Sequence, residues 1–221
     1  MPDNVFDANL ARVASQSCPK ILMIVGSNGR ELQPDHIRVN SGIEIFELNL
    51  KNLHGVLNFL KHFNPARAPE IIQFDLAGNH LERHSVDDTM QVLMEICRII
   101  SQRFKRSKVI ITPPLRRKIQ GFEEKSKRFV KRLGGYVSSE NRKNNRIIIL
   151  LFNNCLLTSD WALFKDSRHL TGHLDVPQGS PCGLDYLADS YRAAINWLKP
   201  PAAPRLEEPG WLKPGPGGRH K

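Results

Sequence analysis

The fold of this chain is decided by the stretch Ile21-Leu22-Met23-Ile24-Val25-Gly26-Ser27-Asn28-Gly29-Arg30. Its first half is a short apolar run with β-branched residues, which is typical of a buried strand, and its second half is small and polar, as in a turn that leads into a helix. Four further apolar runs of the same kind follow at 43–48, 71–76, 109–111 and 147–152. The sequence therefore predicts a sheet of five strands.

Stretches with apolar residues at helical spacing separate these runs. They cover residues 53–63, 86–104 and 122–133, and a last helix is predicted over 183–198. Strands that alternate with helices pair in parallel through right-handed crossovers, so the pattern predicts an α/β fold. We expect a three-layer α/β/α sandwich with a five-stranded parallel sheet in flavodoxin-like order. Ligands of such sheets bind at the carboxyl ends of the strands, so functional residues are expected directly after each run.

Length and composition predict one domain with two terminal segments. A chain of 221 residues with 40% apolar content can bury one substantial core. Residues 1–18 lack strong periodicity and are predicted to be an N-terminal extension, and residues 19–199 form the predicted domain. Residues 200–221, rich in Pro, Gly and basic residues, are predicted to be a disordered tail.

The cysteines and the apolar runs predict a cytoplasmic location. Cys18, Cys97, Cys155 and Cys182 are widely spaced and form no C-x-x-C pair, which suits a reducing compartment better than a disulfide scaffold. The N-terminus has neither the basic nor the apolar region of a signal peptide. No apolar run approaches the ~18 residues that a membrane span needs, so no membrane span is predicted.

Short polar motifs lie beside three of the predicted strands, and an acid–base pair lies nearer the C-terminus. The motifs are Gly26-Ser27-Asn28, Asn40-Ser41-Gly42 and Gly78-Asn79-His80. Asp166 precedes His169 by three residues, a spacing that lets a carboxylate orient an imidazole as a general base. Each motif taken alone is typical of an ordinary turn or surface loop.

Taken together, the order of these motifs resembles the SGNH (GDSL-type) hydrolase superfamily over about residues 20–198. The resemblance implies a nucleophilic Ser after the first strand, an oxyanion hole completed by a Gly and an Asn from the next two motifs, and an Asp-x-x-His pair. Carried over by position, the implied catalytic residues are Ser27, Gly42, Asn79, Asp166 and His169. The Gly-x-x-x-Leu-Ala that usually follows the His is found at 183–188, displaced by an insertion.

The first motif departs from the family pattern. Where the family has Gly-Asp-Ser, an ungapped alignment places Ser27 at the Asp and Asn28 at the nucleophile, and an amide cannot replace a hydroxyl nucleophile. A one-residue deletion would instead make Ser27 the nucleophile and would re-aim its Oγ, to which hydrolysis is sensitive. The family's Asn-Asp is Asn79-His80 here. The site is therefore interpreted as vestigial, with both registers left open.

Positive charge is concentrated in one segment of the chain. Of 32 Lys and Arg and 22 Asp and Glu, residues 101–150 hold fifteen and three, so the remainder is slightly acidic. Localised charge of this kind indicates a polyanionic partner, which we interpret as a nucleic acid. The predicted RNA-contacting residues are Arg103, Lys105, Arg106, Arg116, Arg117, Lys118, Lys125, Lys127, Arg128, Lys131, Arg132, Arg142, Lys143 and Arg146.

A degenerate SGNH-like domain with a basic surface is similar to the C-terminal germ-plasm domains of the Oskar type, in which that fold binds RNA, and to SGNH-like domains encoded by retrotransposons. The leading hypothesis is therefore an RNA-binding module that is not an enzyme, with single-stranded or structured mRNA as its partner. One alternative is an ester hydrolase that uses Ser27, His169 and Asp166. Another is a protein-interaction scaffold that uses the old cleft.

Two further features of the sequence limit the predicted chemistry. Few aromatic residues lie within the basic segment, Tyr136 being the nearest exposed candidate, so no platform for base stacking is predicted. His169 and His173 have i, i+4 spacing, but a Gly lies between them and the sequence suggests no third ligand. No metal centre and no cofactor are predicted.

Overall fold

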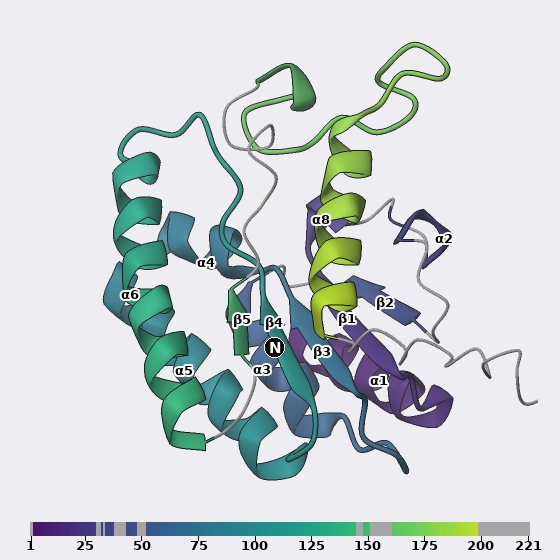
Figure 1. Cartoon of the computed structure of the whole chain (residues 1–221), viewed down its shortest axis with the longest axis vertical. Helices are drawn as coiled ribbons and strands as arrows, with labels where there is room; N and C mark the ends of the chain where they lie inside the picture. The colour runs from purple at the N-terminus through teal and green to yellow at the C-terminus, as the bar shows by residue number, and fades with distance from the viewer. Residues whose placement is uncertain are drawn as a thin grey trace, which may run out of the picture.

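The computed structural model describes residues 2–29, 32, 34–37, 43–47, 52–144, 148–150 and 161–198. In this part of the chain, helices cover both faces of a parallel sheet (Figure 1). The predicted three-layer α/β sandwich is therefore confirmed.

The sheet has five strands in the order β2-β1-β3-β4-β5, which is the predicted flavodoxin-like order. The strands are β1 Ile21–Val25, β2 Ile43–Glu47, β3 Ile71–Phe74, β4 Lys108–Ile111 and β5 Ile148–Leu150. All neighbouring pairs are parallel, and Ile21 of β1 lies opposite both Ile43 and Ile71. The carboxyl ends of β1, β3 and β4 consequently meet at one edge of the sheet.

The described helices connect these strands and form the two outer layers. They are α1 Pro2–Ser17, η1 Ser27–Gly29, α2 Pro34–Ile37, α3 Leu53–His62, α4 Ala77–Arg83, α5 Val86–Arg103, α6 Phe122–Asn144, η2 Trp161–Leu163 and α8 Gly183–Leu198. In Figure 1, α8 lies in front of the sheet, and α1, α3 and α5 lie behind it.

Alternation of side chains along the strands divides the core in two. Leu22 and Ile24 of β1 pack in the cluster that also contains buried residues of α1, α3, α5 and α6. Ile21, Met23 and Val25 point to the other face, where they share a cluster with α8. Both faces are apolar because parallel strands are covered on both sides.

Besides the short helices α2 and α4, which were not predicted, α1 and α6 differ from the sequence expectation. The predicted extension over residues 1–18 contains α1, whose Ala11 and Ala14 are fully buried in the core. Small alanines let the helix pack closely without the wide apolar stripe that makes a helix easy to predict. The helix predicted over 122–133 continues to Asn144, because Val137 extends its buried stripe beyond Gly134 and Gly135.

No helix in the described ranges is long and apolar enough to cross a membrane. The predicted tail, 200–221, lies outside the described residues.

Candidate functional site

The turn after β1 is held against the end of β3. The Gly26 amide donates to Asp75 Oδ1 at 2.8 Å, and the Gly29 amide donates to the Gly26 carbonyl at 2.9 Å. A Cβ on Gly26 would lie 2.7 Å from Cδ2 of Leu76, so a larger residue here would displace the Leu76 side chain. This packing fixes η1, which carries Ser27 and Asn28, at the carboxyl edge of the sheet.

Asp166 and His169 form the acid–base pair that the sequence predicts. His169 Nδ1 lies 2.6 Å from Asp166 Oδ2, and the amides of Arg168 and His169 donate to Asp166 Oδ1 at 2.6 and 2.7 Å. Partial desolvation acts to raise the pKa of the Asp166 carboxyl, but the hydrogen bonds from the His169 ring and from the two amides outweigh it and lower the pKa to about 2. Asp166 therefore stays ionised and orients the imidazole.

Asn28, rather than Ser27, contacts the loop that carries His169. Asn28 Oδ1 accepts from the Leu170 amide at 3.0 Å, and Asn28 Nδ2 donates to the Arg168 carbonyl at 3.4 Å. These bonds hold the backbone on both sides of the imidazole. In the described part of the chain, no hydrogen bond joins Ser27 Oγ to His169. This arrangement favours the ungapped register, in which an amide stands where the family has its nucleophile.

Asn79 lies in the first turn of α4, beside a very small cavity. Asn79 Oδ1 accepts from the guanidinium of Arg117, and its Nδ2 lies 3.4 Å from where a Cβ on Gly26 would be. The cavity has a volume of about 20 Å³ and is lined in part by Ser27, Asn79, Arg117 and Tyr191. That volume is close to what one water molecule needs. Gly42, the second implied oxyanion donor, lies outside the described residues.

Arg117 occupies the centre of this site, contrary to its prediction as a surface RNA contact. Arg117 is only 8% exposed. Its guanidinium forms an ion pair with Glu82 and donates a hydrogen bond to Asn79. Glu82 also accepts from Arg168 at 2.6 Å, so the network extends to the His169 loop. Gly78 leaves room for the guanidinium, because a Cβ there would lie 3.0 Å from Arg117 Nη2. The sequence shows a basic cluster but not which member turns inward.

A half-buried carboxylate, that of Asp75, adjoins the cavity and was not predicted. Asp75 accepts the Gly26 amide on one oxygen and the Tyr191 hydroxyl, at 3.0 Å, on the other. Burial raises the pKa of Asp75 to about 6, although both hydrogen bonds and the charge of Arg117 act to lower it. The position of Asp75 directly after β3 could have indicated its role from the sequence, since this fold places functional residues at the carboxyl ends of its strands.

His80, which replaces the family's Asp, points away from the cavity into a histidine cluster. Its ring is stacked on His84 with centroids 4.2 Å apart and meets His54 edge-on at 5.0 Å. Burial lowers the pKa of His80 to about 4, and the charges of the two neighbouring rings add to this effect. A neutral, buried His80 is therefore part of the core and not of the candidate catalytic site.

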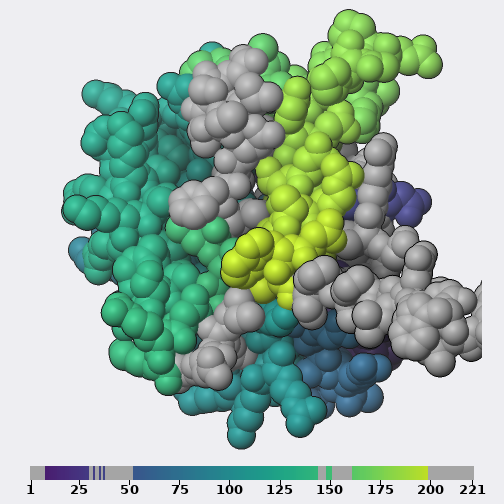
Figure 2. Space-filling view, viewed as in Figure 1, coloured from purple at the N-terminus to yellow at the C-terminus, as the bar shows by residue number. Residues whose placement is uncertain are grey.

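The basic surface follows α6, whose outer side is uncovered at the edge of the molecule (Figure 2). The exposed cations predicted to contact RNA are Lys127, Arg128, Lys131, Arg132, Arg142 and Lys143 on α6 and Lys105, Arg106 and Lys118 outside it. Arg116 and Lys125, which were also predicted, are half-buried. Arg103 has a structural role, because its guanidinium donates hydrogen bonds to the carbonyls of Leu60 and Phe63 at the end of α3. Arg146 lies outside the described residues.

Acidic side chains neutralise part of this surface. Lys127 lies 3.1 and 3.0 Å from carboxylate oxygens of Glu123 and Glu124, and Arg132 pairs with Asp87. Arg128 and Lys131 are exposed and form no ion pair with any described residue. On α6, the charges of these two side chains are therefore available to a ligand.

An aromatic side chain that the sequence analysis missed lies within the basic surface. The Trp161 ring has Arg116 Cζ 4.8 Å and Lys118 Nζ 4.6 Å from its centroid, which are cation–π distances. Trp161 lies outside the basic segment 101–150, so its position in the sequence did not indicate that it contacts Arg116 and Lys118. Tyr136, the aromatic residue singled out from the sequence, is partly buried and packs against the core.

Comparison with known proteins bears on the fold. A scan against protein-family models finds no match, and a search of curated proteins finds no significant match. Among solved structures, a Streptococcus pneumonia protein whose name refers to platelet activating factor is 12% identical, with a TM-score of 0.66 over 90% of this chain and 94% of that chain. A GDSL-like lipase from Bacteroides thetaiotaomicron is 13% identical, with a TM-score of 0.61 over 89% and 98%.

A member of the lipolytic G-D-S-L family from Veillonella parvula is 11% identical, with a TM-score of 0.57 over 81% of this chain and 98% of that chain. Likeness at such low identity concerns the fold and does not transfer an activity. The neighbours share the α/β arrangement described above. This chain has the SGNH hydrolase-like α/β fold.

Proposed function

We propose that this chain is an RNA-binding module built on the SGNH hydrolase-like fold, with the phosphate backbone bound along α6. The observation that carries the proposal is the exposed face of this helix. Arg128, Lys131 and Arg132 are exposed within two turns of the helix, while Phe129 and Leu133 of the same helix are buried. Contacts of Lys and Arg with phosphates supply affinity that does not depend on base sequence.

The state of the old active site supports a binding role over a catalytic one. Asn28 offers an amide where a hydroxyl nucleophile is needed, and its side chain is engaged by the His169 loop. Arg117 takes the space beside Asn79, and the cavity that remains there, about 20 Å³, is close to the size of one water molecule.

Charge reversal on α6 tests this proposal. Arg128→Glu combined with Lys131→Glu is expected to weaken binding of a short mixed-sequence single-stranded RNA about 20-fold at ~0.1 M salt, because two phosphate contacts are lost. The slope of log K against log salt should also become shallower by about 1.4. Fluorescence anisotropy over a series of salt concentrations measures both quantities.

The matched control reverses two exposed cations on the opposite side of the molecule. Arg12→Glu combined with Lys20→Glu changes the net charge equally but lies on or beside α1, away from α6 (Figure 1). This variant should retain the affinity and the slope of the wild type within about twofold. Equal weakening by both pairs of substitutions would show that RNA responds only to net charge, and the proposed surface would be wrong.

Ester hydrolysis is a second candidate, favoured by one observation. The Asp166–His169 pair has the geometry of a working acid–base dyad, and in the tautomer that donates Nδ1–H to Asp166 the other ring nitrogen is free to accept a proton. Ser27 lines the same small cavity as Asn79. A hydrolase would use Ser27 for attack and Asn79 in the oxyanion hole.

The rate of hydrolysis of activated short-chain esters distinguishes the RNA-binding module from the ester hydrolase. We expect the wild type, Ser27→Ala and His169→Ala to show the same slow background rate, because Ser27 is not bonded to His169 among the described residues. In a working triad, loss of either residue lowers turnover by roughly 10³-fold or more. A wild-type rate that disappears in both variants would establish the hydrolase and displace our assignment of the site as vestigial.

A further inference from the structure

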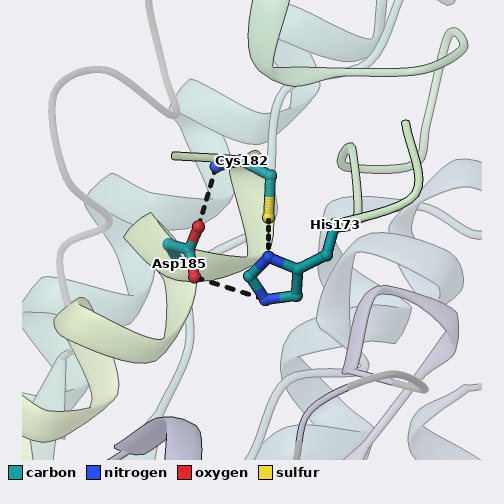
Figure 3. Close-up of side chains that lie close together, drawn as sticks. All are labelled: His173, Cys182 and Asp185. Atoms are coloured by element: carbon teal, nitrogen blue, oxygen red, sulfur yellow. Dashed lines mark hydrogen bonds and ion pairs between the residues drawn. The ribbon is translucent and has the colours of Figure 1, made fainter. Parts of the chain in front are cut away.

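Three potential metal ligands, two at the start of α8 and one in the loop before it, lie close together. They are His173, Cys182 and Asp185, shown in Figure 3. Cys182 Sγ lies 3.8 Å from His173 Nδ1, and Asp185 Oδ1 lies 3.5 Å from His173 Nε2. One donor atom from each residue can be chosen so that all three lie within 4.8 Å of one another.

Backbone hydrogen bonds hold this arrangement in place. The Cys182 amide donates to Asp185 Oδ2 at 2.8 Å, so the carboxylate is oriented from the first turn of α8. The loop before His173 is tied to the same turn, because Gly183 and Leu184 donate to Thr171 at 2.8 and 3.1 Å. The positions of the three donors therefore depend on the fold and not on chance contacts between long side chains.

We propose that His173, Cys182 and Asp185 bind a divalent cation of the zinc type. A thiolate, an imidazole and a carboxylate are the donors that Zn²⁺ takes in proteins, whereas Mg²⁺ and Ca²⁺ prefer oxygen alone. In a tetrahedral zinc site the sulfur and the nitrogen are about 3.6 Å apart, which is close to the separation of Cys182 Sγ and His173 Nδ1. The three protein ligands leave a fourth position for water.

Binding at this site exchanges a proton for the metal ion. The Cys182 thiol loses its proton to solvent and the thiolate forms the bond to the ion, so affinity rises with pH. The His173 side chain is 52% exposed and gives the ion a path from solvent. Asp185 Oδ2 accepts the Cys182 amide and Oδ1 faces His173 Nε2, so Oδ1 turns from that nitrogen toward the ion when His173 coordinates through Nδ1.

The same three residues form a poor nucleophilic site. Burial raises the pKa of the Cys182 thiol, and a neutral thiol that is fully buried does not attack a substrate. A metal ion reverses this preference, since it stabilises the thiolate directly. The expectation of no metal centre rested on His169 and His173, but the structure pairs His173 with residues nine and twelve positions further along the chain.

Zinc titration of the full chain tests the proposal. The protein is stripped of metal with a chelator, kept reduced, and titrated with ZnCl₂ in a calorimeter and with CoCl₂ in a spectrophotometer. We expect one ion per chain and a thiolate-to-cobalt charge-transfer band. Cys182→Ser and His173→Ala should each weaken zinc binding more than about 100-fold, since even residues that only orient ligands cost 10- to 100-fold.

Matched variants make the result specific. Cys18→Ser and His62→Ala replace the same residue types outside the cluster and should leave affinity and the cobalt spectrum unchanged. His173→Ala removes an exposed side chain, so it should keep the wild-type near-ultraviolet circular dichroism even if Cys182→Ser unfolds. Failure of the wild type to bind zinc, or undiminished binding by folded His173→Ala, would overturn the proposed site.

Discussion

Arg117→Ala is expected to lower the free energy of unfolding by about 3 kcal/mol at neutral pH, because breaking a buried ion pair from one side is strongly destabilising. The substitution leaves Asn79 Oδ1 without its donor and removes one of the two partners of Glu82. It also opens a cavity beneath Phe122, over whose ring the guanidinium lies at 5.3 Å. Urea unfolding followed by far-ultraviolet circular dichroism measures the effect.

The adjacent Lys118 provides the control for Arg117. Lys118 is exposed and contacts the Trp161 ring, so Lys118→Ala should cost less than about 1 kcal/mol. Folded Arg117→Ala should bind RNA as tightly as the wild type, because a buried guanidinium does not reach phosphate. Equal loss of stability in the two variants, or a specific loss of RNA affinity in Arg117→Ala, would mean that Arg117 is an exposed RNA contact, as predicted from the sequence.

Asp75→Asn is expected to change how stability depends on pH, by about 3 kcal/mol between pH 4 and pH 8. Burial raises the pKa of Asp75 from 3.8 to about 6, so the folded protein holds this proton more tightly than the unfolded chain does. The contribution of the protonated carboxyl is complete below pH 3.8 and is lost as the pH rises through about 6. An asparagine stays neutral throughout, so the variant should gain stability relative to the wild type as the pH rises.

The difference between Asp75→Asn and the wild type is the quantity to measure. His80 opposes Asp75, since its lowered pKa, about 4, makes the folded protein more stable as the pH rises through 4 to 6.5. That contribution is common to both proteins and cancels in the difference. Asp189→Asn, at an exposed ion pair with Arg192, should show a difference that stays within about 0.5 kcal/mol over the same range. A similarly flat difference for Asp75→Asn would mean that this carboxyl titrates at its ordinary pKa.

The main elements of the fold could be predicted because their signals are local. Apolar runs such as Ile21–Val25 are too short and too β-branched for helices, and the helical stretches between them leave parallel pairing as the only simple connection. The signal failed for α1, whose contact with the core is made by small side chains such as Ala11 and Ala14. Its amphipathic pattern is weak because close packing of alanines does not require a broad apolar face.

The candidate site was predicted where its chemistry lies within a few residues of the chain. Asp166 and His169 are three residues apart, and the local loop brings them to 2.6 Å. The roles of Arg117, Asn28 and Asp75 could not be predicted in this way. Each depends on a partner 35 to 142 positions away, so sequence spacing contains no information about it.

By itself, the sequence determined the order of strands and helices, the position of the acid–base pair and the concentration of positive charge, because these follow from periodicity, short-range spacing and composition. Only the tertiary structure decided which cation is buried, which residue of Ser27 and Asn28 contacts the His169 loop, and that His173 meets Cys182 and Asp185. Those outcomes depend on how the ends of separate strands and loops meet across the sheet, where burial and hydrogen bonding act on residues distant in the chain.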